Sequence, residues 1–60
     1  MLQVYIETKT QGMSLLKECS SVDQAKDYLL TFNKVVRKDM YLVEKRIDGE
    51  YSLDIDKILS

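Results

Sequence analysis

The chain has 60 residues, with nine Lys or Arg against ten Asp or Glu and a formal net charge of −1. This balance argues against broad, non-specific binding to nucleic acid, which needs a surplus of positive charge. Cys19 is the only cysteine and there is no histidine, so an intramolecular disulfide is excluded and a zinc site lacks its usual ligands. A chain of this size buries only about 60% of its unfolded surface and usually needs an additional source of stability. Association into a homodimer is the source that remains.

The overall composition indicates a folded protein, with 45% hydrophobic and 32% charged residues. No apolar run approaches the length of a membrane span. Glu7 and Glu18 interrupt residues 1–20, which hold no signal-peptide core. A free cysteine without an export signal favours a reducing compartment. We therefore expect a cytoplasmic protein, and no membrane partner, with one domain that covers residues 1–60.

The first predicted element is a strand over residues 2–8, where apolar and polar side chains alternate. One side of this strand carries Leu2, Val4 and Ile6, which we expect to face the core. Tyr5 then lies on the opposite side of the sheet.

A turn follows, because Gly12 can adopt a positive φ after two polar residues. Residues 13–19 are compatible with a second strand that returns along the first. Leu15 and Leu16 are adjacent, however, and must point to opposite faces of a regular strand. The alternation therefore leaves the register of this strand open.

The clearest element is a helix over residues 22–37. Ser21 and Gln24 form a capping box, in which the Ser21 hydroxyl accepts a hydrogen bond from the Gln24 amide and the Gln24 side chain reaches back. Apolar residues then recur at spacings of three and four, which places them on one stripe of a helix. The stripe consists of Val22, Ala25, Leu29, Phe32 and Val36, flanked by Tyr28 and Val35.

A second hairpin is predicted from residues 40–47 and 51–55 around Asp48-Gly49. A two-residue loop at Asp48-Gly49 would mix polar and apolar side chains on both faces. A three-residue loop, residues 47–49, with Gly49 at positive φ separates the faces, so we favour it. It pairs Lys45 with Tyr51, Val43 with Leu53, Tyr41 with Ile55, and Arg46 with Glu50.

The predicted fold class is therefore α+β, with the order β-β-α-β-β and one helix packed on a mainly antiparallel sheet. Ile58 and Leu59 either extend the last strand or fold back onto the domain. The signals that predict this fold are general ones, and no motif points to a particular family.

No set of residues predicts catalysis, a cofactor or a metal site. Cys19 lies just before a helix N-terminus, but the chain has no histidine to act as its base, so a structural role is favoured. Four carboxylates lie close together near the second hairpin, without a calcium-binding motif. A solvated strand face explains them better than cation binding or imitation of nucleic-acid phosphates. They are Asp48, Glu50, Asp54 and Asp56.

A candidate basic patch lies at the end of the helix and on the third strand. Such cations could contact phosphate, although Lys and Arg at a helix C-terminus also complement the helix dipole. The tyrosines could stack on bases, but Tyr28, Tyr41 and Tyr51 fall on the predicted core faces. The patch consists of Lys34, Arg37, Lys38, Lys45 and Arg46.

Apolar residues outside the predicted core are candidates for an interface. Leu30 lies roughly 120–140° from the helix stripe at 100° per residue. Tyr5 and Leu42 lie on the sheet face opposite the predicted core, where several apolar side chains would form a patch. The alternative is that the Ile58-Leu59 segment covers that face.

The sequence thus favours a non-enzymatic protein-binding module that acts as a homodimer. Small proteins of this kind often regulate or inhibit a larger protein, as those of phages and mobile elements do. The alternative is a small nucleic-acid-binding protein that uses the basic end of the helix and the third strand. A contiguous basic face in the folded protein would favour the alternative.

Overall fold

Four strands and three helices follow one another in the computed structural model, which describes residues 1–60. The order β-β-α-β-β predicted from the sequence is confirmed, with two short helices added to it. The elements are β1 (Leu2–Thr8), β2 (Gly12–Cys19), α1 (Val22–Leu29), α2 (Lys34–Arg37), β3 (Met40–Arg46), β4 (Gly49–Leu53) and α3 (Ile55–Leu59).

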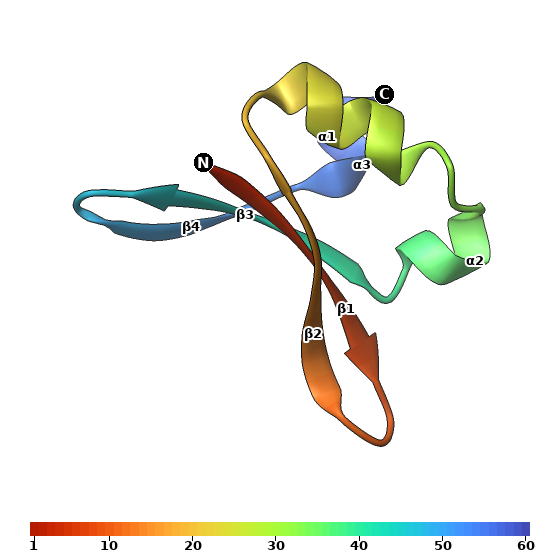
Figure 1. Cartoon of the computed structure of the whole chain (residues 1–60). Helices are drawn as coiled ribbons and strands as arrows, with labels where there is room; N and C mark the ends of the chain where they lie inside the picture. Colours follow the sequence, from red (N-terminus) through yellow and green to blue (C-terminus); the bar gives the residue numbers. More distant parts are fainter.

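The strands form one antiparallel sheet in the order β2-β1-β3-β4. The sheet is strongly twisted, so that the β1–β2 hairpin extends downward in Figure 1 while the β3–β4 hairpin extends to the left, beyond the helices. The molecule measures 30 × 26 × 16 Å. Its smallest dimension has room for the sheet and one layer of helices, and for no further layer.

The core lies between the sheet and the helices. Val4 on β1 stands opposite Leu42 on β3, and both side chains are completely buried. Residues directly opposite each other on antiparallel strands share a face, so this pair defines the covered side of the sheet. The buried apolar cluster consists of Leu2, Val4, Cys19, Ala25, Leu29, Met40 and Leu42.

The helical region is divided into two helices, so the prediction of one helix over residues 22–37 is wrong. α1 ends at Leu29, and the Thr31 hydroxyl donates a hydrogen bond to the Tyr28 carbonyl at 2.6 Å. Asn33 then caps α2, its Oδ1 accepting from the amide of Val36 at 2.9 Å. Side chains of this kind compete with helical hydrogen bonding and end the helix. Phe32 and Val36 nevertheless pack against the core, as the stripe predicts.

The start of α1 agrees with the predicted capping box in one of its two hydrogen bonds. The Ser21 hydroxyl accepts from the Gln24 amide at 3.2 Å. The Gln24 side chain accepts from the amide of Ser20 at 2.9 Å, one residue earlier than the capping box requires. Val22, the first residue of the predicted stripe, is exposed.

The β3–β4 hairpin has a two-residue loop, Ile47-Asp48, and the predicted three-residue loop is wrong. Its register differs by one residue from the prediction, so that Leu42 faces Leu53 and Lys45 faces Glu50. The pairing of β3 with β1 determines this outcome, because it places Leu42 opposite Val4 in the core. The predicted positive φ of Gly49 is confirmed, at +149°.

The chain ends in α3, which folds back over the covered side of the sheet. Asp54 caps this helix, its Oδ1 accepting from the Lys57 amide at 3.4 Å. Ile55, Ile58 and Leu59 pack against the buried cluster. The segment therefore covers the same side as α1, and the opposite side of the sheet remains uncovered.

Candidate interaction surface

The sheet has one face without helices, which we call the uncovered face. The strand register gives the cross-strand neighbours on this face. Tyr5 lies between Leu15 on β2 and Tyr41 on β3, and Gln3 on β1 lies opposite Val43 on β3. Tyr5 is therefore on this face, as the sequence predicts. The apolar side chains of the face are Tyr5, Met13, Leu15, Tyr41 and Val43, and all of them are exposed or half-buried.

A β-bulge explains how both leucines of β2 are accommodated. The partner of Val4 is Lys17 and the partner of Tyr5 is Leu15, so Leu16 is the extra residue. Because the bulge adds one residue to β2, the side chains of β2 on either side of it still point to the same faces as their partners on β1. Leu15 is consequently placed on the uncovered face, where 47% of it remains exposed, and Leu16 is exposed beside it.

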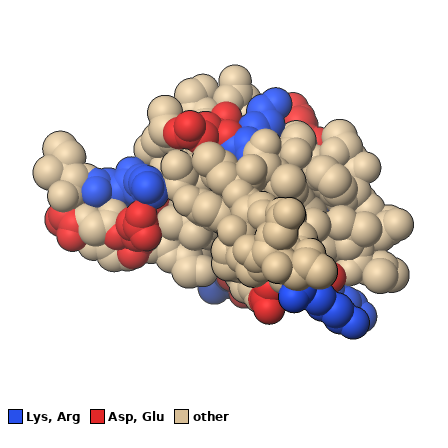
Figure 2. All heavy atoms as spheres, turned by 60° about the horizontal axis from the view of Figure 1, so that its bottom comes forward, with Lys and Arg blue, Asp and Glu red and all other residues tan.

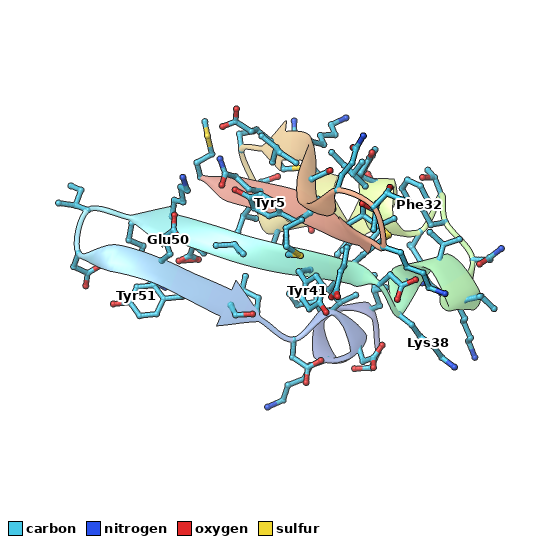
Figure 3. The ribbon with its side chains drawn as sticks, turned by 90° about the horizontal axis from the view of Figure 1, so that it is seen from below. Tyr5, Phe32, Lys38, Tyr41, Glu50 and Tyr51 are labelled. Atoms are coloured by element: carbon cyan, nitrogen blue, oxygen red, sulfur yellow. The ribbon has the colours of Figure 1, made fainter.

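The two tyrosines at the centre of the uncovered face lie side by side on β1 and β3 (Figure 3). The Tyr5 hydroxyl donates a hydrogen bond to Gln3 Oε1 at 2.7 Å, and the Tyr41 hydroxyl donates one to Glu7 Oε2 at 2.9 Å. The bond to the Glu7 carboxylate, together with its charge, raises the pKa of Tyr41. Because both hydroxyls have partners within the sheet, the rings present an apolar surface to solvent.

Charged side chains lie mainly at the rim of this surface. Figure 2 shows a broad area without Lys, Arg, Asp or Glu across the middle of the view, with charged groups around it and on the projecting end at the left. Soluble monomers rarely expose a large contiguous apolar area, and such areas often mark interfaces.

A groove of about 790 Å³ opens where β3 and β4 meet the short helices. Tyr41 lines this groove and also belongs to the uncovered face, so it is shared by the two surfaces. Leu30, a predicted interface residue, is exposed at the groove. The apolar lining consists of Leu30, Met40, Tyr41, Leu53, Ile55 and Leu59.

Opposite charges line different sides of the groove. Lys34, Arg37 and Lys38 come from α2, while Asp54 and Asp56 come from the start of α3. None of these five side chains forms an ion pair within the chain, because the two salt bridges of the structure lie elsewhere. The groove therefore combines an apolar lining with uncompensated charges of both signs.

The candidate basic patch is divided in the structure. Three of its cations belong to α2, while Lys45 and Arg46 lie at the far end of β3, about 20 Å along the strand. Lys45 pairs with Glu50 at 3.2 Å, and Arg46 pairs with Glu44. The bond from Arg46 lowers the pKa of Glu44 and raises that of Arg46.

The structure also gives the positions of Cys19 and of the carboxylates near the second hairpin. Cys19 is almost completely buried at the end of β2, where its side chain belongs to the core. The four carboxylates near the second hairpin do not form one cluster. No group of three or more His, Cys, Asp or Glu residues is placed to hold a metal ion.

The structure changes the set of candidate interface residues. Leu42 is 0% exposed, so its assignment to the open side of the sheet is wrong. Its neighbours Tyr41 and Val43, which the sequence placed on the core face, lie on the uncovered face instead. No local signal in the sequence identifies them; the pairing of β3 with β1 does, because it places Tyr41 opposite Tyr5.

Comparison with known proteins gives no relative from which a function could be transferred. No family model matches the chain, and no curated protein or solved structure matches it. No helix of the structure has the length and apolar character that crossing a membrane requires. The surfaces of the protein are therefore the basis for a functional proposal.

Proposed function

We propose that this protein is a cytoplasmic, non-enzymatic protein-binding module that acts as a homodimer and regulates or inhibits a larger protein. The observation that supports the proposal most directly is the apolar uncovered face around Tyr5 and Tyr41. A second copy packed on this face would turn each two-layer protomer into half of a four-layer dimer with its two sheets at the centre.

The limited core of the protomer supports self-association. Only 8 of the 60 residues are buried, and Gln3, which is 7% exposed, is the only one of them on the uncovered face. A small chain without disulfides gains stability when a partner removes additional apolar surface from water. Packing two uncovered faces together would supply this burial to both protomers at once.

The polar groups of the uncovered face favour one orientation of the two sheets. Glu7 lies near one end of the face and Lys45 near the other. A two-fold axis that runs across the strands places the Glu7 end of one protomer over the Lys45 end of its partner. An axis along the strands would instead bring the two Glu7 carboxylates together, so we favour the first arrangement.

The alternative, a nucleic-acid-binding protein, has less support. A phosphate-binding surface requires its cations on one face, whereas these lie in two separate groups. Lys45 and Arg46 have carboxylate partners, and Asp54 and Asp56 lie at the same groove as the cations of α2.

Sedimentation equilibrium at micromolar concentration tests the proposal. We expect a mass of twice the 7.0 kDa of the chain. Leu15→Lys places a charge within the contact and should shift the protein to monomer. Val35→Lys is the matched control, because Val35 is 73% exposed on α2 and lies outside both surfaces. A wild-type protein that remains a monomer would contradict self-association.

A further inference from the structure

The groove beside the short helices leaves apolar side chains in contact with solvent. Leu30, which follows directly on α1, is 59% exposed there, and Leu53 and Leu59 are only half-buried. The volume of about 790 Å³ lies in the range of ligand-binding clefts, about 300–1,000 Å³. A second apolar surface that fills this groove would remove its lining from water.

The two sides of the groove carry opposite charges, and we call them the basic wall and the acidic wall. The basic wall is formed by Lys34, Arg37 and Lys38 of α2, and the acidic wall by Asp54 and Asp56 at the start of α3. None of these side chains forms an ion pair within the chain. Figure 3 shows Lys38 on α2, with α3 in blue beside the labelled tyrosine of β3. The groove is therefore an apolar floor between two walls of opposite charge.

These walls favour a macromolecule over a small polar ligand. A cleft for a small molecule places a few polar groups deep among its apolar ones, whereas every charged side chain of this groove is exposed or half-buried. The phosphates of a nucleic acid would approach Asp54 and Asp56 together with the cations of the basic wall. A protein segment that carries charges of both signs complements the two walls at once.

The distribution of charges fits a helix better than an extended segment. Side chains of a strand alternate between two opposite faces, so one face would contact the floor and the other would point to solvent. Successive positions of a helix differ by 100°, so an apolar stripe can contact the floor while the positions on its two flanks reach the two walls. Docking of an amphipathic helix in an apolar groove is a recurring mode of recognition.

A second copy of this chain has no free helix of this kind. Ala25 and Leu29 of α1 are buried in the core, and Val36 of α2 packs against it. Ile55 and Ile58 of α3 do the same. Because each helix already uses its apolar side within its own protomer, the occupant of the groove is a segment of a different protein.

We propose that the groove binds an amphipathic helix of the larger protein, with acidic residues on one flank of its apolar stripe and basic residues on the other. The stripe would lie on Leu30 and Leu59, the acidic flank would face the basic wall, and the basic flank would face the acidic wall. This contact rests on the protein-binding role proposed above and specifies the partner segment, but it does not require the homodimer.

A selection from displayed helical peptides tests the pairing of charges. The probe is a library of peptides of about 16 residues with a fixed leucine stripe and with Glu or Lys at each flanking position. The wild-type protein should enrich peptides with Glu on one flank and Lys on the other roughly tenfold over peptides with the same charge on both. Both mixed arrangements count, because they are equivalent for helices that dock in opposite directions. Failure to enrich any peptide would contradict the proposal.

Charge variants of the groove test which walls make the contact. Lys34→Glu with Lys38→Glu leaves the basic wall with a net negative charge, so the enriched peptides should then carry Lys on both flanks. Lys9→Glu with Lys26→Glu makes the same change of charge outside the groove and should retain the mixed preference. A variant that only loses its fold would bind less peptide but would not acquire a new preference, and circular dichroism verifies the fold of each variant.

The apolar floor is tested with one enriched peptide. Leu30→Ala should weaken its binding roughly tenfold, whereas Val35→Ala, at an exposed position outside the groove, should leave it unchanged. In an NMR titration, the amides of α2 and α3 should shift on addition of the peptide. Shifts centred on Tyr5 and Leu15 would place the peptide on the uncovered face and overturn the groove as its site.

The outcomes separate this contact from the proposed homodimer, which sedimentation equilibrium measures independently. A dimer that enriches no peptide, or whose preference the groove charges do not change, overturns the groove contact and retains the dimer. A monomeric wild-type protein that enriches mixed flanks retains the groove contact and overturns the dimer. A preference that changes with the groove charges, together with weaker binding in Leu30→Ala, supports the proposal.

Discussion

The hydroxyl of Tyr41 on β3 donates a hydrogen bond to the carboxylate of Glu7 on β1, with 2.9 Å between the oxygens. This bond crosses the uncovered face and fixes the orientation of the Tyr41 ring, which also lines the groove. The ring therefore belongs both to the groove and to the uncovered face that we propose for association.

A titration of Tyr41 tests this hydrogen bond. The bond to Glu7 raises the pKa of the phenol above its ordinary value of about 10. The associated stabilisation is complete below pH 10 and is lost as the pH rises through the raised pKa. In Glu7→Gln, the Tyr41 ring should titrate at a lower pH than in the wild type. NMR of the ring carbons measures both curves, and identical curves would show that the bond does not form in solution.

Truncation of Leu29, the last residue of α1, tests the position of the core. Leu29→Ala removes a completely buried side chain and should lower the free energy of unfolding by about 2–5 kcal/mol. For a chain of 60 residues this is comparable with the whole stability. Urea unfolding gives the value, and Val35→Ala serves as the exposed control with little expected change.

The break between the two helices depends on Asn33. Asn33→Ala removes the cap of α2 and should cost about 0.5–2 kcal/mol, whereas Asn33→Asp retains an acceptor for the Val36 amide and should cost less. Urea unfolding compares the variants. If both substitutions are equally neutral, the cap does not maintain the break.

The hairpin loop depends on the conformation of Gly49. Its φ of +149° is poorly accessible to a β-branched residue, so Gly49→Val should destabilise the hairpin by about 1–3 kcal/mol. No neighbouring atom would clash with the new side chain, so the cost arises from the backbone. Ser52→Val on the same strand is the control, and thermal unfolding of both variants makes the comparison.

Local signals in the sequence predicted much of the fold. The strand over residues 2–8, the positive φ of Gly12 and the cap at Ser21 each depend on residues that are close together in the chain, and the structure agrees with all three. The helix break was missed because Phe32 and Val36 continue the apolar stripe. Hydrogen bonds made by Thr31 and Asn33 outweighed the continuity of that pattern.

The candidate surface was less predictable because it depends on pairing between distant strands. A one-residue change of register exchanges the faces of a strand. The hairpin alone favoured Tyr41 and Val43 as core residues, whereas the pairing of β3 with β1 placed Leu42 in the core. Local patterns in the sequence do not encode that pairing, so they indicate Tyr5 on the open side but not its true neighbours, Tyr41 and Val43.

The most direct test of the central claim, that a second copy covers the uncovered face, is an isotope-filtered NOE measurement on a mixture of labelled and unlabelled protein. We expect NOEs between protomers that link the rings of Tyr5 or Tyr41 in one protomer to the methyl groups of Leu15 or Val43 in its partner. A dimer whose NOEs between protomers involve none of these side chains would contradict it.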